Sequence, residues 1–179
     1  DCEAVLERAL EYLRACGRRR VAFLARSLPD WLHAMVAKVS AGFNVTTHDR
    51  WIQEPRQHDR AIGNSAVLLM DRRQAEPPDS LVILDDNGVP AATRALVETG
   101  LKIPEEAHVV AHTNYPMPTM AHCPVRRLGW DARDFLHEAV TILDRANRGQ
   151  EWTHATKMRP VFGEQVPPAQ PELRTDDHA

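Results

Sequence analysis

The chain has 179 residues, of which 43% are hydrophobic and 26% are charged, and its formal net charge is −3. This length and balance are typical of one globular domain or of two small lobes, and they exclude a chain that is disordered throughout. The slightly acidic charge argues against a basic nucleic-acid-binding surface within these residues. No run reaches the roughly 18 apolar residues that a membrane helix needs, so no membrane partner is expected.

Cysteine usage and the absence of several motifs narrow the class further. Cys2, Cys16 and Cys123 are odd in number and contain no C-x-x-C pair. They indicate neither a disulfide framework nor a zinc site, and we expect reduced thiols in the cytoplasm. The sequence lacks the glycine-rich loops that hold phosphates and the G-x-S-x-G turn of serine hydrolases. Because it begins with Asp1 instead of Met, the chain is expected to be a processed product, a partial chain or a cloned fragment.

Apolar spacing predicts helices and strands that alternate along the chain. Helices are expected at residues 3–15, 31–40, 58–73, 89–99 and 131–146, and strands at 21–25, 44–47, 81–84, 108–111 and 153–162. Residues 112–124 are predicted to form a loop and residues 163–179 a loose tail. Gly17 and Gly100 are predicted to end helices, and Asp131 to cap the last one.

This alternation predicts an α/β fold with a doubly wound parallel sheet. In such sheets, ligands bind beyond the carboxyl ends of the strands. The rule selects three segments as the place to look for a site, namely residues 26–30, 85–88 and 112–115.

Asp85 and Asp86, which follow the clearest strand, are the sharpest local feature. Carboxylates at such a position accept strong hydrogen bonds from ligand hydroxyls, so a polyol or sugar is a natural ligand. An equally weighted alternative is that Asp86 or Asn87 caps the next helix and binds nothing. Trp51, which follows the predicted strand 44–47, is an aromatic ring that could stack on a sugar.

The order of these segments resembles the effector domain of the lactose-repressor (LacI/GalR) family. Residues 9–24, ALEYLRACGRRRVAFL, are similar to that family's helix-then-strand phrase A-x-x-H-L-x-x-x-G-H-R-x-I-A-x-L. Residues 81–96, LVILDDNGVPAATRAL, resemble its A-x-x-x-x-N-D-x-x-A-x-G-x-x-x-A-L, and residues 97–106 follow with VETGLKIPEE. The resemblance extends over about residues 5–162.

The resemblance implies a periplasmic-binding-protein-like fold with two lobes around a small-molecule cleft. This chain would hold the second lobe, and the helix near 130–147 would cross over to a first lobe outside the chain. Residues 1–162 would then form the effector-binding part, ahead of the tail at 163–179. A DNA-binding domain would also lie outside these residues.

Ligand residues are carried over by position. Asp86 matches the aspartate of the family's N-D pair, and Asp85 replaces the asparagine, which adds a charge. His33 falls nearest the effector-binding arginine of the family. Trp51 lies where some members place an aromatic ring on the sugar, and residues 113–114 replace the D-D pair after the fourth strand.

These features predict a ligand-sensing domain of a bacterial transcriptional regulator, with no catalytic residue, no metal and no cofactor. A sugar would bias lobe closure, DNA would be bound through the missing domain, and the protein would be a cytoplasmic homodimer. One alternative is a periplasmic solute-binding protein for a sugar. The other is a metal-dependent α/β enzyme that uses Asp85 and Asp86.

Overall fold

A six-stranded sheet dominates the computed structural model, which describes residues 2–27, 29–55, 58–151 and 156–167. The strands are β1 (Val21–Leu24), β2 (Ile52–Gln53), β3 (Ser80–Ile83), β4 (His108–Tyr115), β5 (Arg126–Asp131) and β6 (Val161–Phe162). They lie in the order β2-β1-β3-β4-β5-β6, with every pairing parallel except that of β5 with β6. The predicted α/β fold with a doubly wound parallel sheet is confirmed.

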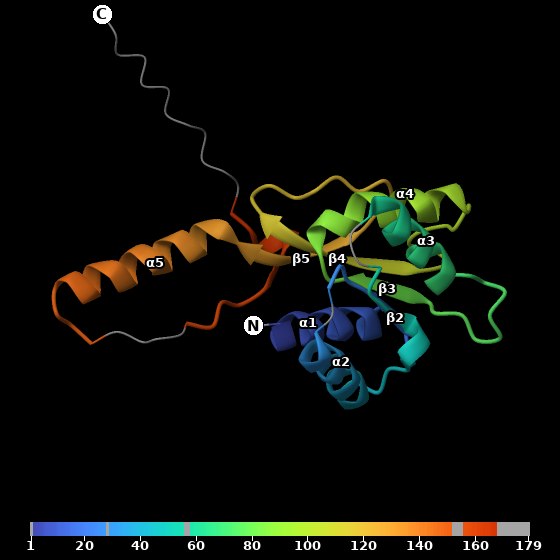
Figure 1. Ribbon diagram of the computed structural model, residues 1–179, viewed down its shortest axis with the longest axis horizontal. Helices are drawn as coiled ribbons and strands as arrows, with labels where there is room; N and C mark the ends of the chain where they lie inside the picture. Colours follow the sequence, from blue (N-terminus) through green and yellow to red (C-terminus); the bar gives the residue numbers. More distant parts are fainter. Residues whose placement is uncertain (1, 28, 56–57, 152–155, 168–179) are drawn as a thin grey trace, which may run out of the picture.

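Helices cover both faces of the sheet, as right-handed crossovers require (Figure 1). The helices are α1 (Cys2–Ala15), α2 (Asp30–Gly42), α3 (Asp59–Leu69), α4 (Val89–Glu98) and α5 (Ala132–Asn147), with short 3-10 turns η1 (Asp49–Trp51), η2 (Asp86–Gly88) and η3 (Gly163–Gln165). Helices α1 and α2 lie on one face, and α3 and α4 lie on the other. None of the described helices is long and apolar enough to cross a membrane.

Two hydrophobic cores follow from the alternation of side chains along each strand. Phe23, Val82 and Val110 point to the α1/α2 face and pack with the leucines of α1. Their strand neighbours, such as Leu81 and Ile83, point to the α3/α4 face. All of these side chains are at most 2% exposed. Each such burial stabilises the fold by about 1.5–3 kcal/mol, and together they hold the strand ends in register.

The edge strands differ from the sequence-based expectation. The predicted strand at residues 44–47 is wrong, because Asn44 adopts a left-handed conformation with φ 52° after the end of α2. Thr46 makes only an isolated bridge to Arg20. The edge strand on this side of β1 is instead β2. Strand β5 was not predicted, and β4 runs four residues beyond residue 111, into the segment that was expected to be a loop.

The last predicted strand, at residues 153–162, is confirmed only at β6, and residues 152–155 lie outside the described residues. The chain beyond β6 contacts β5 and α5 as far as residue 167. Arg126 pairs with Glu164, and Arg133 donates to the Pro167 carbonyl at 3.0 Å. Of the expected tail, residues 163–167 therefore have fixed contacts, and residues 168–179 lie outside the described part of the chain.

Helix α5 projects away from the sheet (Figure 1). It begins at Asp131, whose carboxylate accepts from the Arg133 backbone N–H at 2.9 Å, as the predicted cap requires. None of its 16 residues is buried. The large apolar side chains on it are 53–67% exposed: Phe135, Leu136, Val140 and Leu143.

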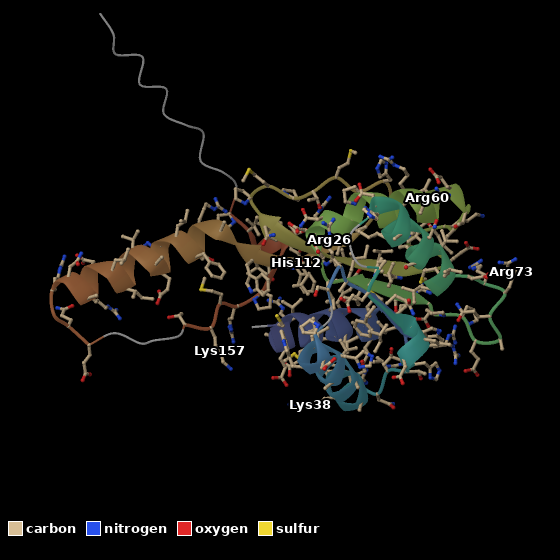
Figure 2. The ribbon with its side chains drawn as sticks, viewed as in Figure 1. Arg26, Lys38, Arg60, Arg73, His112 and Lys157 are labelled. Carbon is tan, nitrogen blue, oxygen red and sulfur yellow. The ribbon has the colours of Figure 1, made fainter. Side chains whose placement is uncertain are left out.

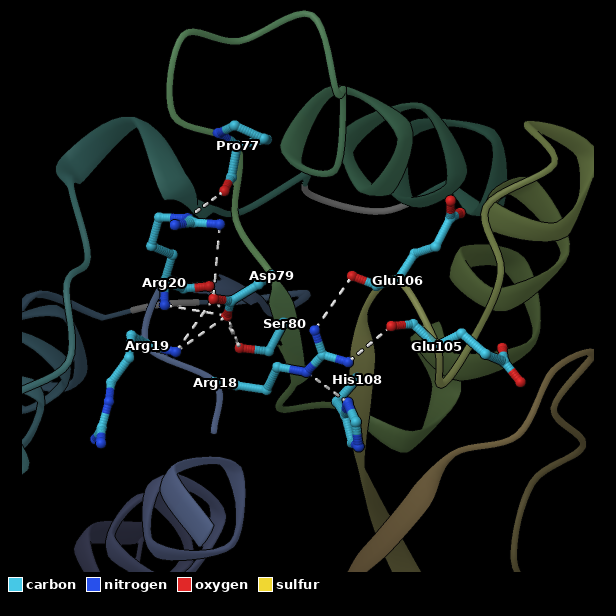
Figure 3. Close-up of polar contacts among 9 residues, drawn as sticks. All are labelled: Arg18, Arg19, Arg20, Pro77, Asp79, Ser80, Glu105, Glu106 and His108. Atoms are coloured by element: carbon cyan, nitrogen blue, oxygen red, sulfur yellow. Dashed lines mark hydrogen bonds and ion pairs between the residues drawn. The ribbon is translucent and has the colours of Figure 1, made fainter. Parts of the chain in front are cut away.

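A polar cluster ties together the amino ends of the central strands (Figure 3). Arg18, just before β1, donates to His108 Nδ1 at 2.8 Å and to the Pro104 and Glu105 carbonyls at 2.9 and 3.0 Å. Asp79, just before β3, accepts from the Arg20 backbone N–H at 3.0 Å. These bonds satisfy backbone groups and need no ligand, so the basic run at residues 18–20 has a structural role.

Candidate functional site

The candidate site is built at the opposite edge of the sheet, where the parallel strands end. Asp85 and Asp86 follow β3, Arg26 follows β1, and Asn114 lies near the end of β4. The register pairs Leu24 with Ile83. Strand ends in register bring the segments that follow them together, as the strand-end rule predicts. Figure 2 shows Arg26 and His112 at this part of the molecule.

Asp85 is held by two neighbours. Its Oδ1 accepts from the backbone N–H of Asn87 at 2.9 Å and from the Asn87 side-chain amide at 3.0 Å. Its Oδ2 lies 3.6 Å from Arg26 Nε. Asp85, and not Asp86 or Asn87, is therefore the residue that caps the following turn η2. A cap therefore exists, but it is formed by Asp85, one residue before the two candidates Asp86 and Asn87. The Asp86 side chain does not cap this turn.

Asp86 links the ends of β3 and β4. Its Oδ2 accepts from the Asn114 amide at 2.6 Å, and its Oδ1 accepts from Asn87 at 3.2 Å. Thr119, in the loop after β4, donates to the Asp86 backbone carbonyl at 3.0 Å. Each carboxylate oxygen can accept more than one hydrogen bond, so Asp86 retains acceptor capacity for a ligand.

His112 lies beside these carboxylates on β4. Burial lowers the pKa of His112, and the negative charges of Asp86 and Asp85 act in the opposite direction to a smaller extent. Its ring stands edge-on to the indole of Trp130, with the centroids 4.9 Å apart. The lowered pKa keeps the imidazole neutral at pH 7, so the negative charge of the edge is not neutralised by this histidine.

The arrangement offers fixed acceptors and amide donors on a partly open edge. Asp85 and Asp86 are half-buried, whereas Asn87 and Asn114 are exposed. Charged acceptors held in place by several donors bind hydroxyls more strongly than flexible surface carboxylates do. The geometry therefore suits a ligand with several hydroxyl groups.

The structure does not bring every predicted residue to this edge. Trp51 is 1% exposed, and its Nε1 donates to Gln74 at 3.0 Å inside the α3/α4 core. This corrects the expectation that its ring faces a ligand, because η1 turns the indole inward ahead of β2. His33 lies half-buried in α2, and no described hydrogen bond or ion pair joins it to Asp85 or Asp86.

Sequence reasoning selected the segments that contain Arg26 and His112 but did not name either as a site residue. The segment 26–30 was selected by the strand-end rule, but nothing in the sequence indicated that Arg26 would face Asp85. His112 was assigned to the loop after its strand, because the apolar run ends at Ala111. The continuation of β4 through Tyr115 could have been suspected from the β-branched and aromatic residues 113 and 115.

The acidic pair is not part of the cavity at the other end of the sheet, and it forms no metal-binding cluster with other described residues. A cavity of about 410 Å³ lies at the carboxyl ends of α3 and α4, where Met70, Arg72 and Glu106 line it, and it does not include the acidic pair. Among the described residues, no three His, Cys, Asp or Glu side chains gather as a metal site would require. The metal-dependent enzyme therefore gains no support from the geometry of Asp85 and Asp86.

Comparison with known protein families identifies the fold. Residues 10–163 match the profile of the periplasmic binding protein-like domain. The match covers most of the chain and includes all six strands. The chain belongs to the periplasmic binding protein-like domain family. A search of curated proteins found no matching relative.

Solved structures with the same fold include transcriptional regulators. A LacI family regulator from Bifidobacterium animalis subsp. lactis matches with a TM-score of 0.76 and 13% identity, over 90% of this chain and 59% of that one. The regulator CcpA of Lactococcus lactis gives 0.72 and 16%, over 90% and 60%. A sugar-binding LacI family regulator from Escherichia coli, complexed with phosphate, gives 0.70 and 18%, over 90% and 59%.

These likenesses agree with the resemblance seen in the sequence and confirm the periplasmic-binding-protein-like fold. The chain spans about 59–60% of the length of these structures.

Proposed function

We propose that this chain is the second lobe of the ligand-sensing domain of a bacterial LacI-like transcriptional regulator. In this proposal, Asp85 and Asp86 bind a small-molecule effector, a sugar, at the carboxyl edge of the sheet. The observation that carries the proposal is the edge cluster itself. Asp86 is bonded to Asn114 on the neighbouring strand, and Asp85 is paired with Arg26, so the acceptors are fixed before any ligand binds.

Helix α5 supports the two-lobe architecture. Its apolar side chains are mostly exposed although they lie on an amphipathic helix. Such a stripe is normally buried against another element. In the proposed protein, α5 crosses to a first lobe outside this chain and packs there, and the sugar is bound between the lobes.

The proposed mechanism is a population shift and involves no covalent chemistry. A sugar that contacts both lobes stabilises the closed arrangement by its difference in affinity for the two arrangements. Closure then changes the spacing of DNA-binding domains, which lie outside this chain, in a cytoplasmic homodimer. One of the structures compared above is described as sugar-binding, which favours this class of effector.

Calorimetric titration of the full-length protein with a panel of monosaccharides tests the proposal. Asp86→Ala should weaken the binding of any sugar that the protein binds by about 10–100-fold, because hydrogen bonds to a charged acceptor contribute about 1.5–3 kcal/mol. Its melting temperature should stay within a few degrees of wild type, since a loop substitution usually costs little.

Asp71→Ala is the matched control. Asp71 also forms an ion pair, with Arg73 at 2.9 Å, but it lies after α3 at the other end of the sheet. The Asp71→Ala variant should bind sugar with the affinity of the wild-type protein. Wild-type affinity in Asp86→Ala, or loss of the fold in that variant, would show that the carboxylate is a structural group and that the site is elsewhere.

A periplasmic solute-binding protein for a sugar is the second candidate, because the matched profile is shared by that class. The coding sequence upstream of Asp1 separates the two. A helix-turn-helix followed by one more α/β lobe is expected, and a secretory signal peptide would favour the transport protein instead.

A further inference from the structure

The cavity at the ends of α3 and α4 lies on the other side of the sheet's length from the acidic pair. Its volume of about 410 Å³ falls within the range of about 300–1,000 Å³ that small-molecule sites occupy. One wall is the end of α3 with the turn at residues 71–73, and the other is the end of α4 with residues 99–102. Figure 2 shows Arg73 at this end of the molecule, away from Arg26 and His112.

Part of the cavity surface is apolar. Val67 of α3 and Leu101, in the segment after α4, are half-buried and are therefore open to an occupant. Met70 and Leu96 also line the cavity, but they are buried and support this surface from the core. A ligand that covers Val67 and Leu101 with hydrocarbon gains free energy by removing apolar surface from water.

The rim carries five charged side chains, of which four are paired with each other. Arg72 Nη1 lies 2.8 Å from Glu106 Oε1, and Arg73 Nη2 lies 2.9 Å from Asp71 Oδ2. The hydrogen bond from Arg73 lowers the pKa of Asp71, so this carboxyl stays ionised. The fifth is Lys102, an exposed residue whose ammonium group has no hydrogen-bond or ion-pair partner among the residues that the structure describes.

Glu106 fixes the backbone that carries Lys102. Its Oε2 accepts from the Lys102 backbone N–H at 2.9 Å, and its Oε1 accepts from Arg72 at 2.8 Å. The same carboxylate therefore joins the segment after α4 to the turn after α3. Because each ion pair is neutral as a unit, the rim keeps one net positive charge, on Lys102.

The two helix ends do not use this charge. Cationic side chains near the carboxyl end of a helix often bond its last carbonyl groups. Here the Gln74 side-chain amide donates to the Leu69 carbonyl at 2.9 Å, and the Thr99 hydroxyl donates to the Leu96 carbonyl at 2.7 Å. Within the described chain, the Lys102 ammonium makes no such bond, so it is available to a ligand.

We propose that this cavity is a second ligand site, which binds a small carboxylate that carries an apolar ring. The ring lies on Val67 and Leu101, and the carboxylate accepts from the Lys102 ammonium. A dianion fits less well, because the ionised Asp71 and Glu106 stand on the same rim and repel the additional charge. The cavity shares no lining residue with the carboxyl edge, so this inference goes beyond the proposed function and does not rest on it.

Matched probes test the inference by titration calorimetry on the full-length protein. The pairs are benzoate with benzamide and 2-naphthoate with 2-naphthamide, because each amide has nearly the shape of its carboxylate and no charge. In at least one pair, the carboxylate should bind roughly tenfold more tightly than the amide, since hydrogen bonds to charged groups are the stronger kind. Acetate, which has the charge without the ring, should bind more weakly than that carboxylate. Equal affinities within both pairs, or no binding of either carboxylate, would overturn the inference.

Lys102→Gln tests the role of the ammonium group. The side chain is exposed, so the fold should be kept, and the carboxylate and its amide should then bind equally. Lys102→Arg keeps the charge and should keep the preference. Lys38→Gln is the matched control, because Lys38 is an exposed lysine on α2, on the other face of the sheet. A carboxylate preference that survives in Lys102→Gln would place the anion elsewhere and overturn the assignment.

Val67→Thr tests the apolar surface. Threonine has nearly the shape of valine and adds a hydroxyl group, so the ring-bearing carboxylate should bind several-fold more weakly. Val97→Thr is the control, because Val97 is 46% exposed on α4 and does not line the cavity. Equal affinities in the two variants would contradict the contact with Val67. The sugar titration depends on other residues, so either proposal can fail while the other stands.

Discussion

Gly129 allows β5 to pack closely against β4, which carries Asn114 of the candidate site. It stands opposite Thr113 in the pairing of β5 with β4. A Cβ atom at this position would lie 1.6 Å from the Thr113 carbonyl oxygen. That oxygen belongs to the backbone and cannot move aside as a flexible side chain can. Only glycine allows the two strands to approach here, one residue from Asn114 and Trp130.

Gly129→Ala should therefore destabilise the protein by about 2 kcal/mol or more, as forced overpacking against a backbone does. Gly42→Ala is the matched control. Nothing lies within 4 Å of a Cβ at Gly42, which ends α2. Since alanine is favoured over glycine in a helix by about 1 kcal/mol, that variant should be unchanged or more stable. Urea denaturation measures both, and equal stabilities would contradict the close approach of β4 and β5.

The acidic pair shows how far single residues could be predicted. Asp85 and Asp86 were located correctly at a strand end, because a buried apolar run followed by carboxylates is a local signal. Their partners Arg26 and Asn114 were not predictable, since those pairings depend on which strands are neighbours. Trp51 was misplaced for the same reason, because its burial depends on the packing of α3 and not on its own neighbours in sequence.

At the scale of elements, the sequence predicted β1, β3, β4 and the five helices, but it did not predict β2 and β5. Strand β5 contains Arg126, Arg127 and Gly129, and so it lacks an apolar run. Arg126 is accommodated there by the rings of Tyr12 and Phe162, whose centroids lie 5.1 and 4.5 Å from its guanidinium carbon. A strand stabilised by stacked arginine has no hydrophobic pattern to detect.

The cluster at the amino ends of the strands gives a pH dependence. Burial and the Arg18 guanidinium lower the pKa of His108. Its Nδ1 accepts from Arg18 Nε at 2.8 Å, which requires the neutral ring. The folded state therefore binds the proton less readily than the unfolded state. Stability should be complete above the unfolded pKa of about 6.5 and should decrease as the pH falls below it.

Denaturation midpoints at pH 7.5 and 5.0 measure this effect. His108→Gln should reduce the loss at pH 5.0, because glutamine does not titrate and can still accept from Arg18. Part of the loss should remain, since burial also lowers the pKa of His112 and its protonation has the same sign. An unchanged acid dependence in His108→Gln would show that the bond to Arg18 does not contribute.

At the scale of the whole molecule, the two ends of the parallel strands differ in chemistry. At the amino edge, Arg18 donates to carbonyls ahead of β4, and Asp79 accepts from the backbone ahead of β1. The carboxyl edge keeps acceptor capacity on Asp86, which is bonded to Asn114. Helix α5 leaves from this same edge with an uncovered apolar face. In the proposed protein, both features are completed by a first lobe and a ligand.

Hydrogen–deuterium exchange of the full-length protein, with and without a monosaccharide that binds it, tests the location of the site most directly. The account predicts slower exchange at residues 84–88 and 112–115, which carry Asp85, Asp86 and Asn114. Residues 70–73 and 99–106, which lie at the cavity of about 410 Å³ at the other end of the sheet, should be unchanged. Protection at that cavity, with none at the carboxyl edge, would contradict the assignment.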